Sequence, residues 1–276
     1  RRSRATRIVS SALRWGLGLL AALVLFTVIA PWFAVDPAMQ FDLANGALLA
    51  PSSAHWLGTD QFSRDVLSRL ATGGRNSLLI ALVAITVATT LGSAVGLAAG
   101  SGDGILSSMW RRLIDVGLAL PRIIVLLVLL AATGSLSTVQ LALVIGITGW
   151  PGIARLVRGE TLRLRHAPWV DAARALGETP RRILWREIFP ATLPPVLVAA
   201  TLGVADAILL EAGLSFIGLG LPVPAPSWGG MLYEAREVIG RAPWLLFFPA
   251  AALVAVTSAT TLIGEALRRT LQPDSR

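Results

Sequence analysis

Three charged side chains inside apolar segments are the first candidates for chemistry in this sequence. Arg122 interrupts one apolar segment, and Asp206 and Glu211 interrupt another. A charge at mid-bilayer costs about 2.5–3.5 kcal/mol on insertion scales, so such residues normally face a protein interior or water. A guanidinium can bind a carboxylate, and a carboxylate can bind an ammonium group. These residues are therefore candidates to line a polar path through a membrane.

A structural interpretation of the same residues stays open. Asp115 lies seven residues before Arg122, which places both on one face of a continuous helix. Arg122 could then pair with Asp115 or extend toward the membrane surface, and Asp206 and Glu211 could make contacts between helices.

The second candidate is the longest charged run in the chain, residues 169 to 190. A short helix is predicted up to Leu176, and Gly177 is expected to end it in a left-handed turn. Thr179 is then a helix cap, Pro180 takes the first helical position, and Pro190 is expected to end the second helix. The pattern predicts helix, Gly turn, helix along a membrane surface.

Several enzymatic and metal-binding functions find no support in the residues. The 24 basic residues are all Arg, so the Lys of a nucleotide-binding P-loop is missing. The sequence has no Cys, and its two His, at 55 and 166, have no acidic cluster nearby. We predict no catalytic residues, no metal ligands and no cofactor bound by this chain, which is not itself an ATPase.

Composition indicates an all-α integral membrane protein. Of the 276 residues 54% are hydrophobic and 14% charged, with a mean hydropathy of +0.69. The apolar core of 15–35 is too long for a cleaved signal peptide and predicts a retained first span. Six transmembrane helices are expected in total, at 15–35, 76–102, two within 113–154, 196–216 and 242–264.

The distribution of Arg predicts the orientation of these six spans. Eighteen Arg, including Arg1 and Arg276, fall in the loops and ends on the N-terminal side, against five on the other side. The positive-inside rule places both termini in the cytoplasm. The expected domains are a cytoplasmic segment (1–14), a first transmembrane helix (15–35), an external loop with an amphipathic helix capped by Thr59 (36–75), and a core (76–276) whose cytoplasmic loop spans about 155–190.

Small residues suggest where helices pack closely. Gly92 and Gly96 lie four apart in the second predicted span, a spacing that suits close helix contacts.

The run at 169–190 resembles a family motif. Asp171-Ala172-Ala173, then Gly177, then Ile188-Phe-Pro190 is similar to the EAA loop of binding-protein-dependent ABC importer permeases. Asp stands where that pattern has Glu, and Phe189 where it has Leu. The resemblance assigns ATPase coupling to a set of residues in this loop: Asp171, Ala172, Ala173, Arg174, Gly177, Glu178, Ile188 and Pro190.

Further motifs resemble the C-type permease subunit of dipeptide and oligopeptide importers. These motifs are HWLGTDQFSRDVLSRL from 55, GWPGIARLVRGETL from 149, EAGLSFIGLGLPVPAPSWGGML from 211 and APWLLFFP from 242. Ser63 stands where that family usually has Gly. The resemblance covers residue 50 to the C-terminus and implies a type I ABC importer permease fold in the bacterial cytoplasmic (inner) membrane.

The resemblance also implies partners. They are a second, homologous permease forming a heterodimer, two cytoplasmic ABC ATPases that hold ATP and Mg, an external substrate-binding protein and the lipid bilayer, with no nucleic acid. The loop at 169–190 would carry coupling helices into a groove on one ATPase. Related solutes, such as nickel chelates or glutathione, are alternatives to peptides.

Three other interpretations of the same chain remain open. The charged loop could be a purely structural amphipathic element. Helix, Gly turn and Arg-rich helix also describes a helix-turn-helix, which predicts a membrane-tethered DNA-binding protein. A self-sufficient secondary transporter would take up solute without partners and usually has inverted repeats, which we do not find in the sequence.

Overall fold

The computed structural model describes residues 2–33, 35–42, 45–134 and 136–271, and these are mostly helical with no β-strand among them. Arg1 and Arg276 of the orientation count lie outside the described residues. Five helices in this part are long and apolar enough to span a membrane: α1 (Arg2–Phe33), α2 (Val66–Gly100), α5 (Thr138–Leu164), α8 (Phe189–Phe216) and α10 (Trp244–Leu271).

The segment expected to form the third span, the first of the two within 113–154, is broken. It consists of α3 (Ile105–Ala119) and α4 (Arg122–Thr133), which meet at 82°. Leu120, the residue before Pro121, is extended because proline disfavours the helical conformation of its predecessor. The prediction that Asp115 and Arg122 share one helical face is therefore wrong. Among the described residues there are thus five continuous candidate spans, or six if this bent pair is counted as one span, against the six that the sequence predicts.

The start of α2 differs from the sequence prediction. Asp65 caps the helix by accepting from the backbone N–H of Ser68, and α2 then runs unbroken from Val66 to Gly100. Thr59 lies outside the helix, where its hydroxyl donates to the Gly46 carbonyl. Ser63 has φ +59°, a left-handed conformation that glycine adopts without strain, which accounts for the glycine usual in the resembled motif.

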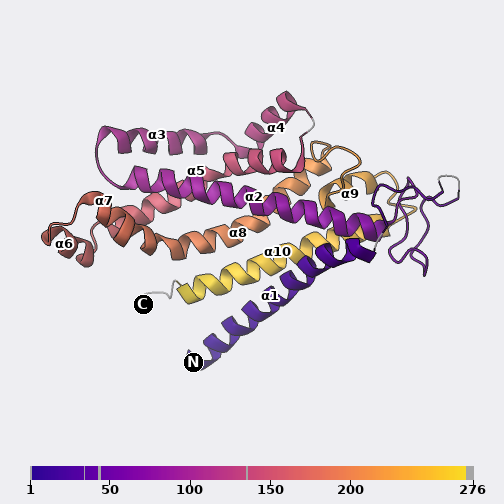
Figure 1. The fold of residues 1–276 in the computed structure, drawn as a ribbon, viewed down its shortest axis with the longest axis horizontal. Helices are drawn as coiled ribbons and strands as arrows, with labels where there is room; N and C mark the ends of the chain where they lie inside the picture. The colour runs from indigo at the N-terminus through magenta and orange to yellow at the C-terminus, as the bar shows by residue number, and fades with distance from the viewer. Residues whose placement is uncertain (1, 34, 43–44, 135, 272–276) are drawn as a thin grey trace.

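Glycines bring α2 and α5 into close contact, as predicted for Gly92 and Gly96. A methyl group on Gly96 would lie 2.6 Å from the Ala154 carbonyl oxygen and 2.7 Å from Val157 Cβ. A methyl group on Gly92 would come equally close to Ile153 of α5. The two helices run side by side along the centre of the molecule (Figure 1).

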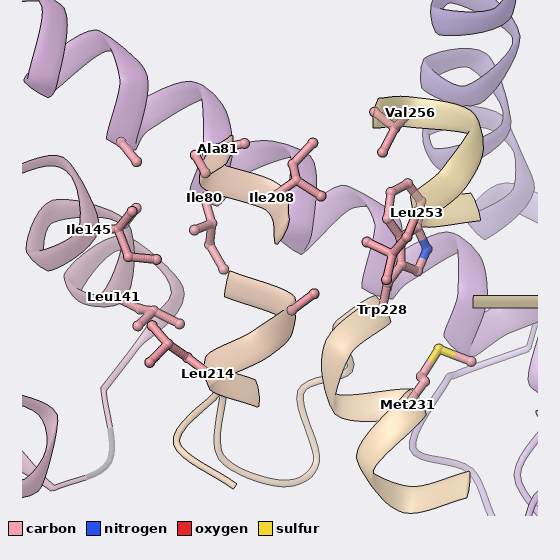
Figure 2. Close-up of a cluster of buried hydrophobic side chains, with 14 of the residues drawn as sticks. Ile80, Ala81, Leu141, Ile145, Ile208, Leu214, Trp228, Met231, Leu253 and Val256 are labelled. Carbon is pink, nitrogen blue, oxygen red and sulfur yellow. The ribbon is translucent and has the colours of Figure 1, made fainter. Parts of the chain in front are cut away.

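The main apolar core joins helices from both halves of the chain. Figure 2 shows buried side chains converging from α2, α5, α8, α9 (Trp228–Ala235) and α10. Trp228 is fully buried, and its indole N–H donates to the Leu70 carbonyl over 3.0 Å. This contact fixes α9 against the beginning of α2.

The two ends of the molecule carry different elements. The short helices α6 (Pro168–Ala175) and α7 (Pro180–Ile183) lie at one end, and α9 with the segment before α2 lies at the other (Figure 1). The beginning of α1 and the end of α10 lie on the side of the molecule that carries α6 and α7 (Figure 1). A buried ion network joins α9 to the segment before α2 and to the first turn of α2, through Asp60, Arg64, Arg69 and Glu234.

The packing at Gly96 makes a testable prediction. Gly96→Ala should destabilise the chain by about 1–3 kcal/mol, because the added methyl group overpacks the α2–α5 contact. Thermal unfolding of the purified chain in detergent measures this. Gly159→Ala is the matched control, since nothing lies within 4 Å of its added methyl group. Equal stability of the two variants would contradict the close packing.

Candidate functional site: a helical loop and a cavity among the spans

The turn between α6 and α7 has the predicted geometry. Gly177 has φ +84°, and the N–H of Glu178 donates to the Ala173 carbonyl over 3.1 Å. Together with the bond from the Gly177 N–H to the Arg174 carbonyl, this is a Schellman motif. Thr179 caps α7 by accepting from the Arg182 N–H. The predictions for Gly177 and Thr179 are confirmed.

Pro190 does not end the second helix, so that prediction is wrong. α7 continues through one wide π turn, η1 (Leu184–Ile188), directly into α8. In that turn the Phe189 N–H donates to the Leu184 carbonyl, one residue farther back than in an α-helix. The extra residue accommodates Pro190, which lacks an N–H and would break regular α-helical bonding.

Apolar side chains fix the loop to the ends of the spans. Val170, Ile183 and Ile188 are buried in a cluster with Leu97 of α2 and Val157 of α5. The loop is therefore a folded element of the membrane body. Its position is set by the same helices that form the core.

Other apolar side chains of the loop face outward. Leu176, at the end of α6, is 85% exposed, and Trp169 and Trp185 are also exposed. Of the alanines in the resembled motif, Ala172 is exposed, whereas Ala173 is half-buried against the cluster. An exposed apolar face on an otherwise charged loop is typical of a surface that binds another protein.

The charges around this face form local pairs. Asp171 pairs with Arg174 over 2.9 Å, so Asp retains a salt bridge at the position where the motif has Glu. Glu178 pairs with Arg182. Arg165, just before the loop, holds Asp103 through two hydrogen bonds, and these bonds lower the pKa of the Asp103 carboxyl below its usual value. Exposed pairs of this kind contribute little to stability.

The transmembrane part contains a cavity of about 440 Å³ between α2, α5, α8 and the α3–α4 break. Arg122 and Asp206 both line it, and Arg122 Nη1 donates to Asp206 Oδ2 over 2.9 Å. Within the described residues Arg122 thus pairs with Asp206 of α8 rather than with Asp115.

Glu211 lies apart from this cavity. Its side chain is fully buried, and it accepts hydrogen bonds from Ser77 of α2 and Ser215 of α8. Trp228 covers the same region, since its backbone N–H donates to Ser77 Oγ. The structure therefore brings two of the three intramembrane charges together and separates the third.

Sequence reasoning missed the outward-facing residues Trp169, Leu176 and Trp185. A signal for one of them exists, because Leu176 is an apolar residue directly before the helix-ending Gly177 in a charged loop. For the two Trp, the exposed side became evident only once the orientation of α6 and η1 on the apolar cluster was known.

Membrane-spanning helices with a folded loop at one end and a charged cavity at mid-span define a transport subunit. Residues 92–276 match the family model described as "Binding-protein-dependent transport system inner membrane component". The chain belongs to this family. It is a permease subunit of an ABC importer in the cytoplasmic membrane, and the family works with ATPase and substrate-binding partners.

Two curated relatives and one solved structure are similar to the chain. The dipeptide transport system permease of Alkalihalophilus pseudofirmus is 36% identical, over 94% of this chain and 84% of the relative. The oligopeptide transport system permease of Bacillus subtilis is 34% identical, over 95% and 85%. An inward-facing MetNI methionine ABC transporter matches with a TM-score of 0.58 at 22% identity, over 74% of this chain and 96% of its own, which supports the fold.

The helix-turn-helix alternative does not fit this geometry. α7 has only four residues before the π turn, and it continues into a membrane span. A recognition helix must lie free in a major groove, which this attachment prevents.

The turn at Gly177 makes a second prediction. Gly177→Ala should destabilise the α6–α7 turn by about 1–2 kcal/mol, because an L-residue there adopts a left-handed conformation. Hydrogen exchange of the α6 amides should become faster, and Gly177→Asn should exchange more slowly than Gly177→Ala since Asn tolerates this conformation. Gly240→Ala, in open space with no positive φ, is the control. Identical exchange in Gly177→Ala and wild type would contradict the strain.

Proposed function

We propose that this chain is the C-type membrane subunit of an importer for dipeptides or oligopeptides. The dipeptide and oligopeptide permease names of the two relatives support this solute class. In the proposed complex the chain pairs with a homologous second permease. Two cytoplasmic ATPases hold ATP and Mg, and an external binding protein delivers the solute.

The loop from α6 to η1 is the proposed contact with one ATPase. The observation that carries this is that Leu176, Trp169 and Trp185 are exposed on a loop whose residues Val170, Ile183 and Ile188 are buried against the ends of the spans. The residues proposed for coupling are those of the resembled motif, with Leu176, Trp169 and Trp185 added from the geometry.

The proposed translocation path passes the Arg122–Asp206 cavity. Both residues line it near the middle of the spans. For Glu211 we propose a packing function instead, because serines and Trp228 enclose it.

The coupling proposal makes a third prediction. Leu176→Arg should leave the chain inserted and folded, because the side chain is 85% exposed and packs little within this subunit. ATP-driven uptake of a dipeptide should fall at least tenfold, since loss of a hot-spot residue of an interface costs about 2 kcal/mol or more. Uptake by the complete complex, together with co-purification of the ATPases, measures this.

Leu271→Arg is the matched control, an exposed leucine at the end of α10 outside the loop. It should transport as the wild type does. Equal uptake by Leu176→Arg and Leu271→Arg would remove the loop face from the coupling contact.

A further inference from the structure

The ion pair in the transmembrane cavity is asymmetric. The Asp206 side chain is 66% exposed, whereas the Arg122 side chain is 30% exposed. Both residues line the same cavity. The carboxylate is the more open partner.

Arg122 uses three of its five N–H donors within the protein. Nη2 donates to the Ile145 carbonyl over 2.8 Å, Nη1 donates to Asp206, and Nε lies 3.5 Å from Thr148 Oγ1. Gly149 provides the space for this arrangement, because a methyl group there would lie 2.8 Å from Nη2. Three of the five N–H groups of Arg122 are thus occupied within the protein, and its side chain is less exposed than that of Asp206.

Asp206 keeps acceptor capacity. Among the described residues its side chain has one polar partner, Arg122, and that bond uses Oδ2. A carboxylate offers about four acceptor positions, so most of them remain available for a donor from outside. Arg122 also offsets part of the cost of keeping the carboxylate charged within the membrane.

The cavity has the size and lining of a small-molecule site. Its volume of about 440 Å³ lies within the range of roughly 300–1,000 Å³ typical of ligand sites. Residues without large side chains leave this space open on each of the surrounding helices: Ala84, Ala88, Gly117, Gly149 and Gly203. Ala84, Gly149 and Gly203 lie near the middle of their spans, which places the cavity at mid-membrane.

We propose that Asp206 binds the ammonium group of the solute as it passes through the membrane. This inference rests on the proposed import of peptides, whose free amino terminus is such a group. It specifies the recognised chemistry: a cationic nitrogen donor meets the more exposed carboxylate, whereas the less exposed Arg122 already donates to three protein acceptors.

The test measures binding of two solutes to the purified complex in nanodiscs without the binding protein. The solutes are dialanine and N-acetyl-dialanine, which lacks the ammonium charge, and saturation-transfer NMR reports their Kd. Wild type should bind dialanine about tenfold more tightly, as expected for a hydrogen bond between charged groups. Asp206→Asn should abolish this preference and Asp206→Glu should restore most of it.

Asp115→Asn is the matched control, an aspartate of α3 outside the cavity lining, and should retain the preference. No preference in wild type, or a preference that persists in Asp206→Asn, overturns the inference. Loss of the second permease from the purified Asp206→Asn complex also overturns it, because Asp206 would then be a subunit contact. Failure of wild-type complex to import dialanine would instead refute the proposed peptide transport.

Discussion

The continuous helical conformation from Pro180 to Phe216 is the constraint on which the rest of this structure depends. α7, η1 and α8 form one continuous helix, because η1 accommodates Pro190 without ending it. At 1.5 Å per residue, about 33 Å of helix joins Leu184 to Asp206. The α7–η1 part of the segment proposed to contact the ATPase therefore belongs to the same helix as Asp206, which lines the cavity.

The neighbouring helices reinforce this connection. α2, α5 and α8 contribute Leu97, Val157 and Val196 to the apolar cluster under the loop, and the same three helices form walls of the cavity. The glycines of α2 hold α5 at close range, so the two sites share one tightly packed support. This arrangement suits a permease, in which closure of partner ATPases must alter a path at mid-membrane.

Local features of the fold and loop could be predicted from sequence, whereas long-range ones could not. Gly177 and Thr179 act through their own backbone neighbourhood, so their positions sufficed. The predictions at Pro190 and Pro121 failed in opposite ways. A π turn accommodates Pro190, so the helix continues, whereas Pro121 breaks a span that the apolar pattern suggested was continuous. Arg122 and Asp206 are 84 residues apart, and their pairing depends on how α4, α5 and α8 pack.

The most direct test of transmission through α8 replaces Arg186 and Glu187 of η1 by Gly, which weakens the helix by about 1 kcal/mol per residue. The ratio of solute imported to ATP hydrolysed by the complete complex is measured, with Gly at Arg268 and Arg269 of α10 as control. If α8 transmits movement, hydrolysis continues in the η1 variant while this ratio falls several-fold and the control stays unchanged. An unchanged ratio in the η1 variant would contradict transmission through this helix.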